Sequence, residues 1–132
     1  MNGKIQLKDL PEAWNARMKD YLGVTVPNDS EGVLQDIHWS GGMIGYFSTY
    51  SLGNIISCQI WEKALQAMPD LYQHFERGEF MPLREWLRDN LHKHGRKFTP
   101  METLQKVVGE GKINVAPYLK YLKTKYSELY RL

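Results

Sequence analysis

One segment constrains the fold more than any other, because the 23 residues from Trp39 to Trp61 carry no charged side chain while 24% of the whole sequence is charged. Such a segment is long enough to cross a membrane. It nevertheless contains four glycines and seven Ser, Thr, Asn or Gln residues, and it lacks the continuous apolar run that a bilayer requires. We therefore expect no membrane span and interpret the segment as buried in protein.

Apolar residues recur at helical spacing along most of the chain, and no run alternates apolar and polar residues over the length of a strand. Proline and glycine mark the starts and stops of these periodic segments. The pattern predicts an all-α fold, with residues 1–132 forming one domain or part of one. The helices that we expect span about residues 9–23, 43–68, 70–78, 82–95, a segment that begins at 99–102, and 115–130.

Two of the expected helices begin with a capping pattern. Asp9 precedes Glu12 by three residues with Pro11 between them, and residues 99–102 read Thr-Pro-Met-Glu. In this pattern the first side chain accepts a hydrogen bond from the helix, and the glutamate reaches back to the start. Gly23 follows the first helix and is expected to end it.

The bulk composition excludes several classes of protein. The 17 basic and 15 acidic residues leave a net charge of +2, which is too balanced to indicate nucleic-acid binding, although two short basic runs occur at 91–97 and 119–125. The single cysteine, Cys58, cannot form an internal disulfide, which fits a reducing cytoplasm. The first residues show no apolar stretch typical of a secretory signal.

No metal-binding or nucleophilic motif is present in the sequence. It contains no HExxH pair, and His92 and His94 are two residues apart, so on a helix they point to different sides. These two histidines are expected to form a solvated, basic helix end, and His74 is expected at or near the surface. Cys58 lies in the neutral segment and is expected to be an inert thiol.

The residues best suited to chemistry surround the start of the neutral segment. Asp36 lies two residues before His38, and a carboxylate near an imidazole can fix its tautomer and raise its basicity. Tyr46 and Tyr50 are four residues apart, so on a helix they share one face. Phenols or an imidazolium so placed can stabilise an oxyanion. The alternative is structural, with His38 bracing the loop and both tyrosines packed in a core.

The same region carries a sequence pattern. It reads Gly-x-x-Gln-Asp-x-His-Trp over 32–39, then Gly-Tyr-Phe over 45–47 and Thr-Tyr-x-Leu-Gly-Asn over 49–54. This pattern resembles the signature near the C-terminus of the carboxypeptidase Taq family, whose members are mostly helical, zinc-dependent, cytoplasmic and commonly dimeric. The segments 8–23, 77–110 and 117–130 also resemble that family, so the resemblance covers nearly the whole chain.

The resemblance implies that this chain corresponds to the C-terminal quarter of a larger, mostly helical HExxH-type metallopeptidase. In the family, the HExxH helix and the glutamate that completes the zinc site lie before this region, and neither has a counterpart here. Zinc is therefore expected in the intact family enzyme, whereas this chain alone is expected to bind no metal and to be inactive. Ser48 stands where the family often has proline.

The resemblance also implies roles for individual residues. His38 and one of the two tyrosines, Tyr46 or Tyr50, would donate hydrogen bonds to the scissile carbonyl of a peptide substrate as it becomes an oxyanion. Asp36 would orient His38. The residues expected on the substrate-binding side of the cleft are Gln35, Asp36 and Trp39. Which tyrosine takes which role stays open.

A second function fits the same residues. An independent helical module could bind a protein partner through the aromatic patch around Trp39, Tyr46 and Tyr50, without catalytic activity. An exposed cleft wall predicts self-association, with the neutral helix buried against a second copy to form a homodimer. The interaction module differs in predicting a monodisperse, well-folded chain.

Overall fold

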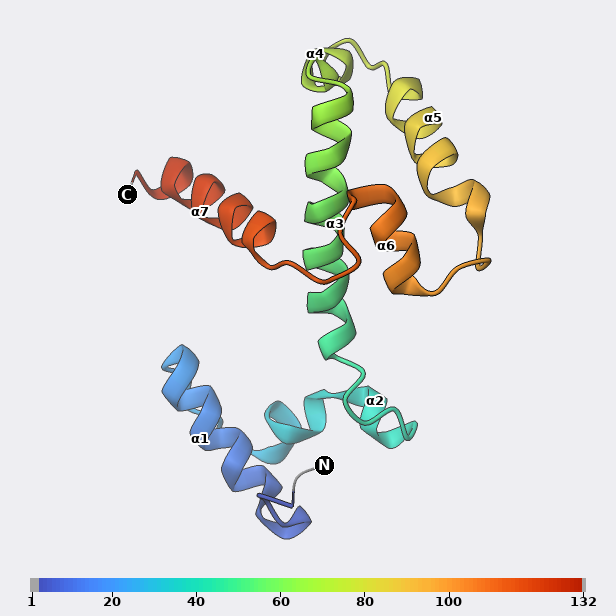
Figure 1. The fold of residues 1–132 in the computed structure, drawn as a ribbon. Coiled ribbons are helices and arrows are strands. Elements are labelled where there is room, and N and C mark those ends of the chain that lie inside the picture. Colours follow the sequence, from blue (N-terminus) through green and yellow to red (C-terminus); the bar gives the residue numbers. More distant parts are fainter. Residues whose placement is uncertain (1–2, 132) are drawn as a thin grey trace. The chain divides into compact units, whose positions relative to one another are not determined.

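The computed structural model describes residues 3–131, and every regular element within them is a helix. The predicted all-α fold is confirmed. The chain divides into two compact units, Met1–Ser48 and Thr49–Leu132. None of the helices in the described part is both long and apolar enough to span a bilayer. Figure 1 shows the elements with their labels.

The first unit begins with η1 (Leu7–Asp9) and α1 (Leu10–Leu22). Gly23 ends α1 as expected, with a left-handed φ of 70° and its N–H donated to the Lys19 carbonyl. The expected side-chain cap at Asp9 is wrong. Because Asp9 is also the last residue of η1, its backbone (φ −95°, ψ 3°) is not extended, and its carboxylate makes no capping hydrogen bond.

The rest of the first unit is a series of short turns: η2 (Asp29–Glu31), η3 (Val33–Gln35) and α2 (Ile37–Ser40). Between η2 and η3, Gly32 approaches its neighbours so closely that an added Cβ would lie 2.6 Å from Val26 Cγ1. Only glycine therefore fits there without displacing other atoms. Val33, which is 5% exposed, anchors the following turn.

The long helix of the chain is α3 (Ser48–Ala67). The sequence predicted a start near Met43, and this prediction is wrong by five residues. Gly42 and Gly45 have φ values of 76° and 82°, so the chain passes through left-handed conformations that a right-handed helix cannot contain. The end of the helix lies one residue from the expected position.

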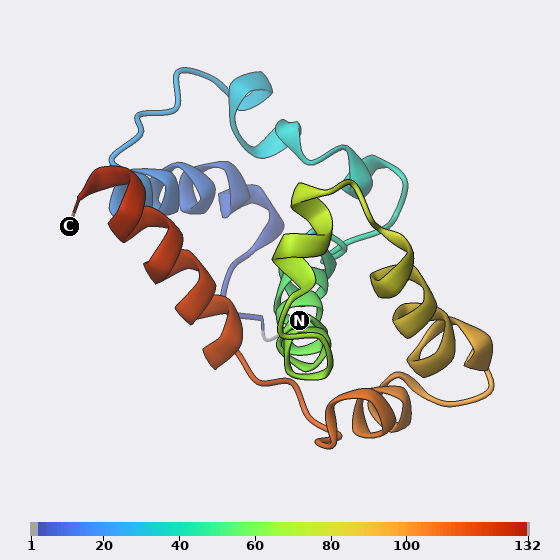
Figure 2. The same cartoon turned by 90° about the horizontal axis from the view of Figure 1, so that it is seen from above.

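The second unit also contains α4 (Leu71–Glu76), α5 (Met81–Asn90), α6 (Pro100–Val108) and α7 (Ala116–Tyr130). Each corresponds to a predicted helix, although α5 begins one residue before the predicted 82–95 and ends at Asn90, after which residues 92–94 form a separate 3-10 turn. Figure 1 and Figure 2 both show α6 beside α3. The predicted capping box of α6 is present, with Thr99 and Glu102 bonded reciprocally. Trp61 stacks with Phe75 at 6.2 Å and contacts Tyr72 edge-on at 6.0 Å, which joins α3 to α4.

Little of this chain is buried. Among the described residues the buried hydrophobic side chains are Val33, Ala64, Leu71 and Leu104. The expected burial of the neutral segment is wrong for this chain by itself, since Phe47 is 53% exposed and Tyr50 is 55% exposed. A helix without charges stays exposed when too few other helices are present to cover it.

Candidate functional site

The predicted pair of Asp36 and His38 forms in the first unit. Oδ1 of Asp36 accepts a hydrogen bond from the backbone N–H of His38 at 2.9 Å and lies 2.9 Å from its ring Nδ1. The side chain of Asp36 is 5% exposed and that of His38 16%. The carboxylate therefore caps α2 and holds the ring at the same time. A ring whose Nδ1–H faces a carboxylate has Nε2 as its second, chemically usable nitrogen.

Aromatic side chains enclose the imidazole. Tyr46 stacks on the ring of His38 with centroids 4.7 Å apart, and Phe47 meets it edge-on at 5.2 Å. The turn that brings them back is fixed by the His38 carbonyl, which accepts hydrogen bonds from the N–H groups of Gly41 (3.1 Å) and Met43 (2.9 Å). The imidazole is thus held by a carboxylate, an aromatic face and an aromatic edge.

The two tyrosines do not share a helical face. Tyr46 lies in the turn before α3, and Tyr50 lies in the first turn of α3 itself. The four-residue spacing therefore does not place the two side chains on one face of a helix. Tyr46 is 42% exposed and Tyr50 55%. The structural alternative, in which both tyrosines pack in a core, is not what this chain forms. Tyr46 belongs to the first unit with His38, and Tyr50 belongs to the second.

Gln35 and Trp39 have separate surroundings. Nε2 of Gln35, an exposed side chain, donates a hydrogen bond to the Ser30 carbonyl, which ties it to the preceding loop. The ring of Trp39 meets Trp14 of α1 edge-on at 6.0 Å. Sequence reasoning did not find Trp14, because no local signal links two tryptophans that are 25 positions apart in the chain.

No group of three or more His, Cys, Asp or Glu side chains in residues 3–131 is arranged to hold a metal ion. His74 lies among charged groups, with Nδ1 2.6 Å from Glu79 and Nε2 3.3 Å from Asp70, but Arg77 donates to the same Glu79 carboxylate at 2.8 Å. Hydrogen bonds from Arg77, and then from His74, lower the pKa of Glu79 to about 2. This cluster is a surface ion-pair network.

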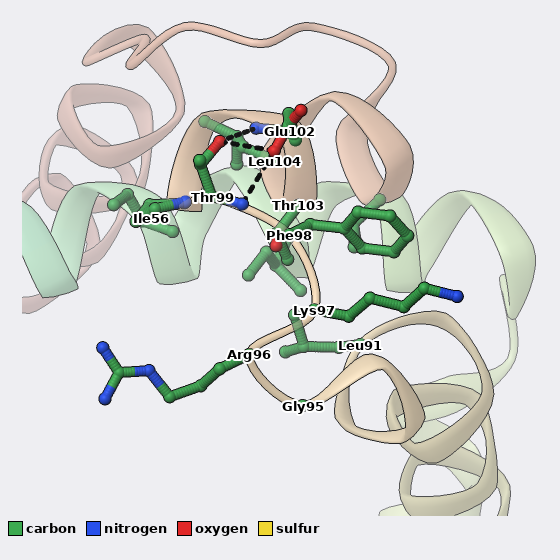
Figure 3. A pocket seen from close by; sticks show the side chains of 13 residues that line it. Ile56, Leu91, Gly95, Arg96, Lys97, Phe98, Thr99, Glu102, Thr103 and Leu104 are labelled. Carbon is green, nitrogen blue, oxygen red and sulfur yellow. Dashed lines mark hydrogen bonds between the residues drawn. The ribbon is translucent and has the colours of Figure 1, made fainter.

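A separate cavity of about 650 Å³ lies in the second unit between α3, the end of α5, and α6. Figure 3 shows the capping box of Thr99 and Glu102 at its wall, with Arg96 and Lys97 extending in opposite directions from the adjoining loop. Ile56 and Leu104 contribute apolar surface. None of the predicted site residues lines this cavity, so the oriented imidazole and the cavity are separate features.

The fold and the site define an all-α protein whose main chemical feature is an imidazole oriented by a buried carboxylate. The model of the carboxypeptidase Taq (M32) metallopeptidase family matches residues 1–126. The chain therefore belongs to the carboxypeptidase Taq family of metallopeptidases, as the resemblance indicated.

Individual relatives agree with this assignment. The chain is 41% identical over 131 residues to Carboxypeptidase 1 of Bacillus subtilis, and the aligned region covers 99% of the chain and 26% of the relative. It is 42% identical over 128 residues to Thermostable carboxypeptidase 1 of Thermus thermophilus, covering 97% and 25%. A crystal structure of the M32 carboxypeptidase from Deinococcus radiodurans R1 superposes with a TM-score of 0.93 at 43% identity, covering 98% of the chain and 26% of that structure. The chain thus spans about a quarter of the length of these relatives.

Proposed function

We propose that residues 1–132 form part of the catalytic domain of a zinc-dependent metallocarboxypeptidase, which removes C-terminal residues from peptides, and supply one wall of its substrate cleft. The observation that carries this proposal is the buried Asp36 carboxylate 2.9 Å from Nδ1 of His38, within the family's sequence pattern. The residues described here do not fit a zinc site by themselves. The metal ligands are therefore assigned to polypeptide outside the described residues.

A zinc ion bound in such an enzyme activates a water molecule and polarises a carbonyl. The contribution of this chain is a positioned proton donor. With its Nδ1–H held by Asp36, His38 presents Nε2, which in the imidazolium form donates a hydrogen bond to the oxygen of the scissile carbonyl as negative charge develops there. The buried carboxylate holds the ring through Nδ1, so the donor is oriented before the substrate arrives.

Tyr46 and Tyr50 are the two candidates for a second hydrogen-bond donor to the same oxygen. The contact of Tyr46 with the His38 ring, at 4.7 Å between centroids, favours Tyr46 as the phenol that acts beside the imidazole. Gln35, Asp36 and Trp39 are proposed to line the substrate side of the cleft.

The test is a chimera in which this chain replaces the matching C-terminal quarter of the Bacillus subtilis relative. Activity is followed as release of the C-terminal residue from an N-blocked dipeptide, and zinc content is measured in parallel. We expect His38→Ala to lower kcat by about 10²–10³-fold, the usual effect of removing one oxyanion donor, at unchanged zinc content. His92→Ala, an exposed histidine of the second unit, is the matched control. An active His38→Ala chimera contradicts the proposal.

The chain alone is proposed to be inactive, without bound zinc, and to self-associate, with a homodimer as the simplest product. The exposed Phe47 and Tyr50 support this, because apolar surface of this kind is normally covered. A monomer at micromolar concentration that binds no hydrophobic dye, seen by sedimentation, contradicts self-association. The single cysteine supports a reducing, cytoplasmic setting.

The same exposure favours the second candidate function, an interaction module without catalytic activity. The two functions differ in the chimera. An interaction module gives no dependence of peptide hydrolysis on His38, whereas a cleft wall requires it.

A further inference from the structure

The first unit carries an apolar groove of about 450 Å³ along α1. One side of the groove is a row of residues spaced four apart: Leu10, Trp14, Met18 and Leu22. The neighbouring row, also spaced by four, contributes Ala13, Arg17 and Tyr21. Rows of this spacing are the ridges that helices use when they pack on one another, and the channel between two rows receives a ridge of the partner. The groove therefore has the shape of a helix-packing surface.

No residue of α1 is buried in this chain. Tyr21 is 70% exposed and Leu22 is 66% exposed, and both line the groove. A 13-residue helix is marginal by itself in water and obtains most of its stability from packing its apolar face. The α1 helix thus has an apolar face that the described residues cover only in part.

A second observation indicates that the surroundings of α1 are incomplete. The indole nitrogen of Trp14, in the wall of the groove, is buried and has no hydrogen-bond acceptor among the described residues. Oδ1 of the adjacent Asn15 is also buried and has no hydrogen-bond donor among them. Buried polar atoms in folded proteins nearly always have a partner. Oδ1 of Asn15 faces the Gly32 loop, whereas the indole of Trp14 lies in the groove wall, so the orphaned indole nitrogen is the atom that indicates a missing partner at the groove.

The lengths of the relatives indicate what that polypeptide is. The Deinococcus radiodurans structure contains the same fold at a TM-score of 0.93, yet this chain covers 26% of it, so about three quarters of that protein lies elsewhere in its sequence. We propose that the α1 groove seats a helix from the metal-binding part of a carboxypeptidase Taq polypeptide. This inference rests on the proposed function, in which the metal ligands come from outside the described residues.

The test compares hydrogen exchange of the α1 amides in the isolated chain and in the Bacillus subtilis chimera, by mass spectrometry. Docking protects α1, and we expect its amides to exchange at least about 10-fold more slowly in the chimera, because local opening then requires undocking. Tyr21→Lys places a charge on the wall of the groove, and we expect it to abolish the extra protection. Ala16→Lys adds the same charge on the exposed opposite side of α1 and is expected to keep it.

The isolated chain controls for folding of the variants. Lysine at position 21, in the last turn of α1, is favourable to the helix dipole, and Tyr21 is mostly exposed. Ala16 is exposed in the middle of the helix, so neither variant should change the exchange of α1 in the isolated chain by more than about twofold. A variant that unfolds α1 in isolation is replaced by Leu22→Lys, which lines the same groove.

Several results overturn the inference. Equal exchange of α1 in the isolated chain and the chimera shows that nothing docks in the groove. Protection in the isolated chain that rises with concentration identifies a second copy as the occupant, and protection independent of concentration identifies the other unit of the same chain. A chimera that fails to fold when the parent relative folds rules out this occupant. Slow exchange of α1 in a chimera that does not hydrolyse peptides supports the docking and refutes the proposed function. Hydrolysis by a chimera whose α1 is unprotected supports the proposed function and refutes the docking.

Discussion

Replacing Gly32 by alanine tests whether close packing on α1 fixes the loop that carries Asp36. A Cβ at position 32 would lie 2.6 Å from Val26 Cγ1, 3.1 Å from the Asn28 carbonyl oxygen and 3.3 Å from Oδ1 of Asn15. Carbon atoms in favourable contact are about 3.5–4.0 Å apart, so the first distance is a clash. The clashing atom of Val26 is a side-chain methyl that must be displaced, and the Asn28 oxygen is backbone. Overpacking of this kind costs about 1–3 kcal/mol.

Gly53→Ala is the matched control, because the chemical change is the same and the added Cβ meets nothing within 4 Å. Position 53 lies inside α3, where alanine is favoured over glycine by about 0.5–1 kcal/mol. Urea unfolding is followed by the indole N–H signals of Trp14 and Trp39 for the first unit and of Trp61 for the second.

We expect Gly32→Ala to lower the midpoint reported by Trp14 and Trp39 by about 1 M urea or more, since a small unit loses about 1 kcal/mol per molar urea. Gly53→Ala should raise the midpoint reported by Trp61. An unchanged or higher midpoint for Gly32→Ala refutes the packing argument, and a loss of stability in both variants shows that glycine itself, rather than its surroundings, is what matters.

Three further predictions follow from the contacts of the described residues. Neutral His38 should be the Nδ1–H tautomer in long-range ¹H–¹⁵N NMR spectra, because its Nδ1 is 2.9 Å from Oδ1 of Asp36. Asp36→Ala should shift the tautomer equilibrium toward the Nε2–H form, and an unchanged equilibrium would show that Asp36 does not set the tautomer. The pKa of Glu79 is lowered from 4.5 to about 2, so its contribution to stability is complete above pH 4.5 and is lost as the pH falls toward 2. Glu79→Gln should make the Tm depend less on pH between 4.5 and 2, and an unchanged pH dependence of the Tm contradicts this. Thr99→Ala removes the side-chain cap of α6 and should lower the free energy of urea unfolding by about 1 kcal/mol. It should also raise the pKa of Glu102, which the Thr99 hydrogen bonds lower, and an unchanged pKa of Glu102 would mean that the capping box does not form in solution.

The sequence predicted helix ends correctly where the signal involves only a few neighbouring residues. The Thr99–Glu102 pattern needs only four residues to close, and it forms as expected. Asp9 shows the same pattern and fails, because the turn before it takes the backbone out of the extended conformation. The start of α3 was missed for a related reason, since the left-handed conformations of Gly42 and Gly45 depend on contacts of the turn rather than on periodicity.

Burial could not be predicted from this sequence alone. A segment without charges indicates a buried helix only if the rest of the body is present to cover it, and Phe47 and Tyr50 remain more than half exposed in the described part of the chain. The chain matches about a quarter of the length of its relatives, so the exposed apolar surface agrees with the proposal that other polypeptide covers it.

The site was predicted in part. The two-residue spacing of Asp36 and His38 is short enough that a capping geometry forces the carboxylate and the imidazole together, and the pair forms. The stacking of Tyr46 on His38 was not foreseen, since the sequence argument placed Tyr46 in a helix with Tyr50. The roles toward a substrate remain predictions for all of the site residues: His38, Asp36, Gln35, Trp39, Tyr46 and Tyr50.

Zinc stoichiometry measured together with peptide hydrolysis tests the central claim most directly, on the isolated chain and on the Bacillus subtilis chimera after dialysis against metal-free buffer. If the chain is a cleft wall that depends on metal ligands held elsewhere, the isolated chain retains no zinc and hydrolyses no peptide, while the chimera retains one zinc and releases C-terminal residues. One tightly bound zinc per isolated chain contradicts the account.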